Sequence, residues 1–237
     1  MNVQFHPAGD LAVLVELEWE ISVELSLRLR ALEMLISKNI AGVVETVPAF
    51  RSLLVYYDPR AIGYEALCDS IARLVTQAAS SVLPQSRVVE LPCCYDDPEL
   101  GFDLHAVAER LGLTSADVIA LHSSAEYLVY FIGFAPGQPY LTGTPEELML
   151  PRLETPRVRT APGSVGIGGT QSCIYAVESP GGFWVLGRTP VPIYDRTAAE
   201  PILLRPGDRL RFRPVARREY DDVAAAVAAR TYQPVIA

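Results

Sequence analysis

The stretch PGSVGIGGTQ, residues 162–171, followed by the apolar run CIYAV at 173–177, decides the fold predicted for most of this chain. Its glycines are spaced almost as in a phosphate-binding loop. Such a loop opens a helix, whose amides face the anion, whereas here a strand pattern follows. Gln171 also stands where the third glycine of GxGxxG belongs, and no GK[ST] is present. We therefore interpret the element either as a structural corner of a β-barrel or as a place where a ligand or partner approaches the backbone.

The segments around this corner are also β-prone. From Glu126 onward, short apolar runs such as YLVYFI, FWVLG and RLRFR alternate with proline and glycine. Many short strands with frequent turns are typical of a closed or nearly closed β-barrel. A terminal helix is expected at about 219–230.

Before the barrel runs, the sequence predicts a strand at 88–93 and a helix at 103–111. A second helix is predicted to start at Thr114, where a hydroxyl residue is followed three residues later by Asp117, the pattern of a capping box. This helix is expected to end near Leu121–His122.

The N-terminal part has a different texture. A strand at 11–16, a helix at 21–37, strands at 43–47 and 52–57, and a helix at 63–76 predict a small layered α/β domain over residues 1–80. Residues 77–88 are small and polar and are interpreted as a linker. The barrel domain would occupy 88–237, which makes the fold class α+β.

Bulk properties exclude several functions. The chain has 237 residues, a net charge of -8 and a pI of about 5.0, which disfavours nucleic-acid binding and adhesion to anionic membranes. The most apolar run, YLVYFIGF at 127–134, is shorter than the roughly 20 residues of a membrane span. No secretory signal is recognisable, so a cytoplasmic location is expected.

The sequence does not indicate a catalytic nucleophile or a metal site. Cys68, Cys93, Cys94 and Cys173 do not show zinc-ligand spacing with the histidines, and no metal site is predicted. Cys173 with His122 is a possible thiol dyad that lacks an orienting third residue. Ser164 lacks the flanking glycine and the following helix of a nucleophile elbow.

The segment GFAPGQPYL at 133–141 predicts a rigid loop, because prolines remove amides that a central strand would need. Phe134 and Tyr140 are candidates for a preformed aromatic wall of a pocket. Arg152, Arg157 and Arg159 follow, and arginines beside a pocket are suited to a carboxylate or a phosphate.

Taken together, GFAPGQPYL, PR at 156–157, PGSVGIGGTQSCIY and SPGGFWVLGRTP resemble the 5-oxoprolinase B-subunit family, also called the KipI or allophanate hydrolase subunit 1 family. GDLAVLVE at 9–16 and VVETVPAFRSLLVYYDP at 43–59 resemble its N-terminal domain, so the resemblance covers nearly the whole chain.

This resemblance implies a cyclophilin-like barrel in the second domain. It implies membership of a complex that opens 5-oxo-L-proline to L-glutamate with ATP, together with a second, KipA-like barrel protein (the C subunit of such complexes) and a larger LamB/YcsF-like protein. ATP would act at the level of the complex, since this chain has no nucleotide motif. Inhibition of a sensor histidine kinase, as in KipI-type members, or carboxyl transfer to an amide are the alternatives.

The candidate site combines one titratable group with a set of binding residues. His122, which titrates near neutrality when unperturbed, is the candidate acid or base. Arg157 and Arg188 are assigned to anion binding, and Ser164 and Gln171 to a lactam or ureido group. The binding or subunit-contact set is Phe134, Pro136, Tyr140, Arg157, Ser164, Gln171, Tyr175 and Arg188.

The sequence departs from the family pattern at two places inside this expected pocket. The usual GFxPGFPYL has an aromatic residue where this chain has Gln138, and the usual Thr-Gly is replaced by Ser172-Cys173. A substrate other than 5-oxoproline is therefore an open possibility.

Overall fold

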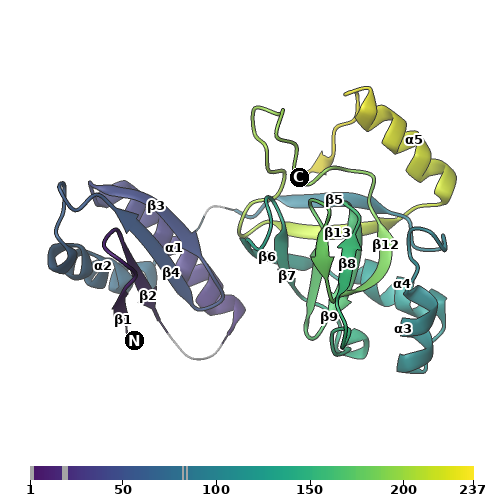
Figure 1. Cartoon of the computed structure of the whole chain (residues 1–237), viewed down its shortest axis with the longest axis horizontal. Coiled ribbons are helices and arrows are strands. Elements are labelled where there is room, and N and C mark those ends of the chain that lie inside the picture. Colours follow the sequence, from purple (N-terminus) through teal and green to yellow (C-terminus); the bar gives the residue numbers. More distant parts are fainter. Residues whose placement is uncertain (1–2, 18–20, 82, 84) are drawn as a thin grey trace. The chain divides into compact units, whose positions relative to one another are not determined.

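A computed structural model describes residues 3–17, 21–81, 83 and 85–237, and these divide into two compact units (Figure 1). The first unit ends at Gln85 and the second begins at Ser86. The predicted α+β class, with a layered unit followed by a β-rich unit, is confirmed.

The first unit is built on a four-stranded antiparallel sheet with the order β1-β2-β4-β3. Its strands are β1 (Gln4–Pro7), β2 (Ala12–Glu16), β3 (Val43–Pro48) and β4 (Ser52–Tyr57). β1 has no apolar alternation in its sequence, QFHP, and becomes a strand because it pairs along β2. The sheet therefore extends one strand beyond the predicted run at 11–16.

Two helices, α1 (Val23–Asn39) and α2 (Tyr64–Ala78), supply the rest of this unit. Alternate residues of β4, Leu53 and Val55, are fully buried with helix residues such as Leu29 in one cluster. Since alternate strand residues point to opposite faces, both helices cover the same face of the sheet. The Ser22 side chain caps α1 by accepting a hydrogen bond from the Leu25 amide at 3.0 Å.

The second unit is organised around an eight-stranded sheet with the order β12-β9-β10-β7-β6-β13-β5-β14. The strands are β5 (Val88–Cys93), β6 (Tyr127–Ile132), β7 (Pro139–Thr142), β9 (Ser164–Gly168), β10 (Gln171–Ile174), β12 (Trp184–Arg188), β13 (Arg209–Pro214) and β14 (Val235–Ile236). All neighbours are antiparallel except β13 and β5, which are parallel.

The sheet curves so that its edge strand β12 returns to the end of β5. Cys94, directly after β5, exchanges two backbone hydrogen bonds of 2.9 Å with Arg188, the last residue of β12. This isolated bridge joins the edge strand β12 to the end of β5, which lies next to the other edge strand β14, so the predicted barrel is nearly closed and is held at this point by a single residue pair. The enclosed core is rich in Val, Leu and Ile, with the larger side chains of Tyr127 and Phe212.

Three α-helices and one 3₁₀ turn complete this unit: α3 (Leu104–Leu111), α4 (Ser115–Ser124), α5 (Arg217–Ala228) and η1 (Glu146–Leu148). The predicted capping box at the start of α4 is confirmed, since the Asp117 amide donates to Thr114 Oγ1 at 3.1 Å and Asp117 accepts from the Thr114 amide. α4 extends two residues beyond the predicted end, and α5 begins two residues earlier than predicted. α3 and α4 add Val107 and Val118 to the barrel core.

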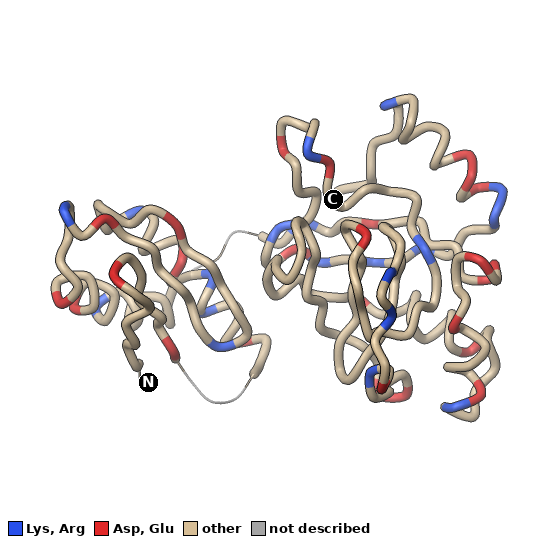
Figure 2. Tube along the Cα trace, viewed as in Figure 1, with Lys and Arg blue, Asp and Glu red and all other residues tan. Residues whose placement is uncertain are grey.

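α5 has no fully buried residue, and it is held by the partly buried Val223 and Tyr220, which pack against core clusters, together with ion pairs. Figure 2 shows basic positions followed by acidic ones at its start. Arg217 donates to Asp97 at 2.9 Å, which ties α5 to the loop after β5, and to Asp221 within the helix at 3.0 Å. Exposed ion pairs of this kind contribute little stability each, so α5 is weakly attached compared with α3 and α4.

Glycines allow unusually close contacts around the corner that the sequence singled out. A Cβ on Gly163, which has a φ of 81°, would lie 2.3 Å from the Thr189 carbonyl oxygen. A Cβ on Gly166 would lie 2.7 Å from the Trp184 carbonyl oxygen. Both positions pack β9 against the segment around β12, which requires residues without a side chain.

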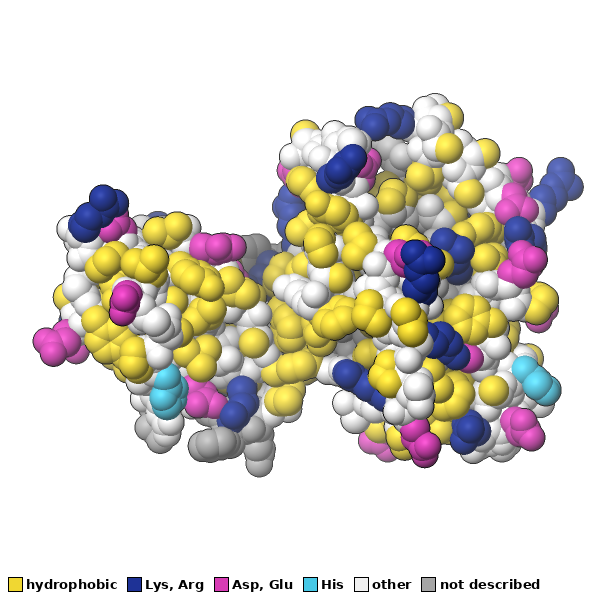
Figure 3. Space-filling model, in the orientation of Figure 1, with side chains coloured by type: hydrophobic (Ala, Val, Ile, Leu, Met, Phe, Trp, Pro, Cys, Tyr) yellow, Lys and Arg dark blue, Asp and Glu magenta, His cyan; other side chains and the backbone are white. Residues whose placement is uncertain are grey.

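A separate two-stranded ribbon, β8 (Arg157–Thr160) with β11 (Ser179–Gly181), lies beside the barrel. Gly181 approaches Tyr175 so closely that a Cβ would fall 1.9 Å from the phenol oxygen. The ribbon is thereby packed onto the outer side of β10. Figure 3 shows hydrophobic side chains interspersed with basic ones on the face that carries β8 and β9.

We predict that Gly163→Ala lowers the free energy of unfolding by about 3 kcal/mol or more, because it adds both backbone strain and an overlap with Thr189. Gly169→Ala is the matched control: Gly169 has a φ of 64° but open space around it, so only the strain of about 1 kcal/mol should appear. Urea denaturation measures both. Equal losses in the two variants would contradict the close contact at Gly163.

Candidate functional site

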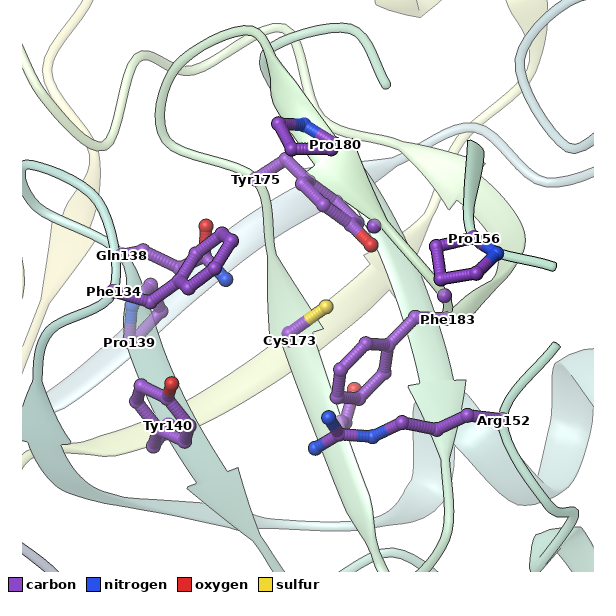
Figure 4. A pocket seen from close by; sticks show the side chains of 13 residues that line it. Phe134, Gln138, Pro139, Tyr140, Arg152, Pro156, Cys173, Tyr175, Pro180 and Phe183 are labelled. Atoms are coloured by element: carbon purple, nitrogen blue, oxygen red, sulfur yellow. The ribbon is translucent and has the colours of Figure 1, made fainter. Parts of the chain in front are cut away.

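A cavity of about 300 Å³ opens between the outer face of β7 and β10 and the β8–β11 ribbon (Figure 4). It is lined by Phe134, Gln138, Pro139, Tyr140, Arg152, Pro156, Ser172, Cys173, Tyr175, Pro180, Gly181, Gly182 and Phe183. The lining is mainly aromatic and apolar, with a few polar groups, which is the usual composition of a small-molecule site.

One wall is formed by the tight loop between β6 and β7. The Gln138 amide donates to the Ala135 carbonyl at 3.1 Å, and Pro136 and the positive-φ Gly137 are the central residues of this turn. Proline followed by glycine is the pattern of a type II turn. The turn leaves Phe134 66% exposed at the cavity, with a φ of 68° that non-glycine residues rarely adopt.

Strand alternation decides which side chains reach the cavity. In and directly after β10, Cys173 and Tyr175 cluster with Phe183 on the outer side. Ile174 belongs to the barrel core, and the Ser172 hydroxyl donates across to the Gly166 carbonyl at 3.1 Å. The cavity therefore lies outside the barrel wall. Figure 4 shows Cys173 and Tyr175 directed toward its centre.

The other aromatic walls are fixed by packing. Tyr140 stacks on Phe131, with ring centroids 4.4 Å apart. Burial raises the pKa of Tyr175 to about 12, so its phenol remains protonated at neutral pH. Phe183 is buried and forms the platform for a cation. These rings provide flat, preformed surfaces for a small ring-shaped ligand.

Arg152 is the cation among the described lining residues, which include no carboxylate. Its guanidinium carbon lies 4.6 Å from the Phe183 ring centroid, and its Nη2 donates to Gln171 Oε1 at 2.9 Å. Gln171 thus does not line the cavity but holds the arginine that does. The remaining guanidinium donors make this end of the cavity favourable for an anion.

Gln138 supplies the polar group on the opposite side. Its side chain is buried, with 5% exposure, and its Oε1 has no hydrogen-bond partner within the described part of the chain. A buried carbonyl without a partner costs about 1–3 kcal/mol. The carboxamide oxygen is therefore a buried polar atom whose hydrogen bonding the described part of the chain leaves unsatisfied.

Cys173 contributes its surface to the cavity rather than a nucleophile. It is buried, and desolvation raises the pKa of its thiol far above the usual range. The thiolate is the nucleophilic form of cysteine, so Cys173 presents a small apolar side chain here.

His122 lies in the barrel core on the far side of β10 from the cavity. It is completely buried, its Nδ1 is 2.8 Å from the Tyr95 hydroxyl, and its Nε2 is 3.3 Å from the Ser172 hydroxyl. Burial lowers its pKa to about 3, so the imidazole is neutral. The structure places this residue among the rings of Tyr127 and Phe212, away from the Cys173 side chain and from the ligand cavity.

Arg157 is engaged in a structural contact. It donates to Asp103 at 2.6 Å and to the Phe183 carbonyl at 3.2 Å, and its guanidinium lies over Phe102. Asp103 in turn accepts from the Val185 amide at 2.7 Å. This arginine joins the ribbon to the barrel and does not line the cavity.

The remaining sequence candidates lie elsewhere. Pro136 is exposed in the turn beside Phe134. Ser164 is buried in β9, paired across the sheet with Arg188. Arg188 donates to the Pro162 carbonyl at 2.8 Å and lines a second cavity of about 440 Å³ against α5. Of the predicted set, Phe134, Tyr140 and Tyr175 are brought together in the main cavity.

The predicted binding set omits several residues that line the cavity, among them Gln138, Arg152, Cys173 and Phe183. Gln138 and Cys173 were marked by their departure from the family pattern. The sequence alone does not distinguish Arg152 from Arg157 as the arginine of the cavity. The difference is that Arg157 pairs with Asp103, which is 54 positions away in the sequence.

Comparison with known proteins defines the class. A model of the carboxyltransferase domain, subdomains C and D, matches residues 3–204, so the chain belongs to this family. Within it, the chain is 39% identical over 210 residues to the 5-oxoprolinase B subunit of Escherichia coli O157:H7, covering 87% of this chain and 93% of the relative. The 5-oxoprolinase B subunit of Bacillus subtilis is 33% identical over 231 residues, covering 93% and 96%.

A solved structure shows the same fold. The crystal structure of TTHA0988 has a TM-score of 0.74 and 40% identity over 86% of this chain. This chain spans 40% of the length of TTHA0988. None of the described helices is both long and apolar enough to cross a bilayer.

We predict that His122 makes the stability of this protein pH-dependent. Its pKa is lowered from 6.5 to about 3 in the folded chain. Between pH 6.5 and 3 the unfolded chain takes up a proton on His122 and the folded chain does not. The free energy of unfolding therefore falls as the pH drops from 6.5 toward 3, and the full contribution of His122 is present above pH 6.5. The slope should approach about 1.4 kcal/mol per pH unit.

Urea denaturation of wild type and His122→Gln over this pH range measures the effect as a difference in slope. The variant should have the shallower pH dependence, because glutamine does not titrate. His105→Gln, which removes an exposed histidine of α3, is the matched control. Parallel curves for wild type and His122→Gln would contradict the prediction.

Proposed function

We propose that this chain is the B subunit of an ATP-dependent 5-oxoprolinase, which opens 5-oxo-L-proline to L-glutamate. The observation that carries the proposal is the identity of 33–39% with three proteins named as B subunits of 5-oxoprolinase, over 87–93% of this chain and nearly all of each relative. A match of this extent includes the segments that build the cavity.

The outer cavity is the substrate site in this proposal. Its volume of about 300 Å³ suits a small ring, its walls are aromatic, and its charged group is a cation that matches the carboxylate of 5-oxoproline. Phe134, Tyr140 and Tyr175 would contact the ring, and Gln171 would position Arg152. Arg157, Ser164 and Arg188 would maintain the ribbon and corner, and His122 the core beneath them.

Partner proteins complete the enzyme. The word subunit in the names of the relatives implies an assembly, and we assign the partners as a second barrel protein and a larger LamB/YcsF-like protein. Phe134 and Val158, which are 66% and 84% exposed beside the cavity and on the ribbon, would be covered by such a partner.

ATP does not fit the site of this chain. The glycine-rich corner leads into β10 and not into a helix, so it lacks the helix N-terminus that holds phosphates. The outer cavity has one arginine among its described lining residues, which leaves a triphosphate without sufficient donors. We therefore assign ATP binding to another member of the complex.

Carboxyl transfer is the second candidate, favoured by the matching family model, which describes a carboxyltransferase domain. In that case the cavity would accept a small amide and the partner would present a carboxylated carrier. The two candidates share the requirement for a small amide beside Arg152 and differ in the co-substrate.

The test is reconstitution of this chain with the two proposed partner proteins from the same cell. We expect L-glutamate and ADP to form from 5-oxo-L-proline and ATP, and no turnover when this chain is omitted. Omitting each partner in turn is the control. The second candidate would replace the first if two results were obtained together. The full assembly would show no ATP hydrolysis that depends on 5-oxoproline, and this chain combined with a biotin-dependent carboxylase would carboxylate urea.

A further inference from the structure

We propose that Gln138 and Arg152 are the specificity-determining residues of the outer cavity, and that they select a small ring acid whose ring carries an N–H and a C=O side by side. Gln138 would pair with this amide edge and Arg152 with the carboxylate. The inference rests on the proposed function for the identity of the site, and it adds which residues recognise the ligand and by which groups.

The state of Gln138 is the first observation. A buried carboxamide normally has its hydrogen bonds satisfied by the protein, yet Oε1 of Gln138 has no partner in the described chain. Oε1 is closed off from solvent as well as unpartnered, so a ligand reaches it only when the carboxamide rotates about its terminal bond and turns Oε1 and Nε2 toward the cavity. A ligand that offers a donor and an acceptor in one plane satisfies both atoms.

A cis-amide edge has that geometry. In a lactam the N–H and the C=O lie on the same side of the ring, so two parallel hydrogen bonds can form with a carboxamide: the ligand N–H donates to Oε1, and Nε2 donates to the ligand carbonyl. A cyclic urea presents the same edge. An amine ring such as proline lacks the carbonyl and leaves half of the carboxamide unsatisfied.

Arg152 is the second observation. Stacking on Phe183 and the hydrogen bond to Gln171 fix its guanidinium in position, which reduces the entropy lost when it binds a carboxylate. Figure 4 shows the guanidinium and the Gln138 carboxamide on different sides of the cavity, with Cys173 between them. A ring acid can therefore contact both groups only in one orientation.

The lining of the cavity disfavours cationic ring ligands. Since no carboxylate belongs to the described lining and the Tyr175 and Cys173 groups stay protonated at neutral pH, a cationic ring would meet Arg152 without compensation. The aromatic residue usual for the family at position 138 would offer no hydrogen bonds. Gln138 therefore gives this chain a polar selectivity in addition to the fit of the ring.

The experiment is calorimetric binding by the full chain with four compounds: 5-oxo-L-proline, 2-oxoimidazolidine-4-carboxylate, 2-pyrrolidinone and L-proline. The first two carry both the amide edge and the carboxylate, and their relative affinity distinguishes a lactam from a cyclic urea as the preferred ligand. We expect 2-pyrrolidinone, which lacks the carboxylate, and L-proline, which lacks the edge, to bind at least about tenfold more weakly.

Variants assign each contact. Gln138→Met, which keeps the length of the side chain without its amide, should weaken the two ring acids about tenfold and weaken L-proline by a smaller factor, because L-proline uses only one of the two amide contacts. Arg152→Met should weaken the ring acids by a similar factor and leave 2-pyrrolidinone unchanged, with partial recovery in Arg152→Lys. Arg159→Met, on the exposed side of the ribbon, is the control and should bind as wild type.

The inference is overturned if wild type binds none of the ring acids, if L-proline binds as well as 5-oxo-L-proline, or if both Gln138→Met and Arg152→Met bind like wild type. Its failure is distinguishable from failure of the proposed function. Turnover of 5-oxo-L-proline by an assembly whose Gln138→Met and Arg152→Met versions keep wild-type KM would retain the function and remove the inference. If the expected binding pattern were found but no assembly turned over 5-oxo-L-proline, the inference would be retained and the proposed function would be removed.

Discussion

The fold of the second unit depends on backbones that touch where a side chain would not fit. Gly163 and Gly166 bring β9 against the segment around β12, and Gly181 brings the ribbon against Tyr175. If these positions carried a Cβ, the ribbon and the barrel wall would have to separate. The cavity between them exists at its present size because the contacts on each side of it are this short.

Strand alternation then sorts chemistry into two compartments. On β10 the same short run sends Ser172 toward His122 in the core and Cys173 toward the ligand cavity. The core compartment is dry, which keeps the imidazole neutral. The outer compartment keeps partly exposed groups such as Arg152, which can exchange water for a ligand. The two sets of polar residues serve different purposes although they are neighbours in sequence.

Much of the fold could be predicted because it follows from local pattern. The helices, the capping box at Thr114 and most strands have their signals within a few residues. The contact that brings the sheet round on itself has no local signal, because it depends on one pair of residues, Cys94 and Arg188, that are distant in sequence. The candidate site divides in the same way. The aromatic wall from Phe134 and Tyr140 is local, whereas the choice of Arg152 over Arg157 depends on where Asp103 lies.

The cavity draws all its lining residues from the single stretch 134–183, and apart from Ser172, whose hydroxyl faces His122, these side chains lie on the opposite surface of the wall from the barrel core. A change at position 138 or 173 therefore alters the ligand surface with little disturbance of the packing that keeps the barrel folded. Ligand preference and folding are thereby governed by side chains on opposite faces of the same strands.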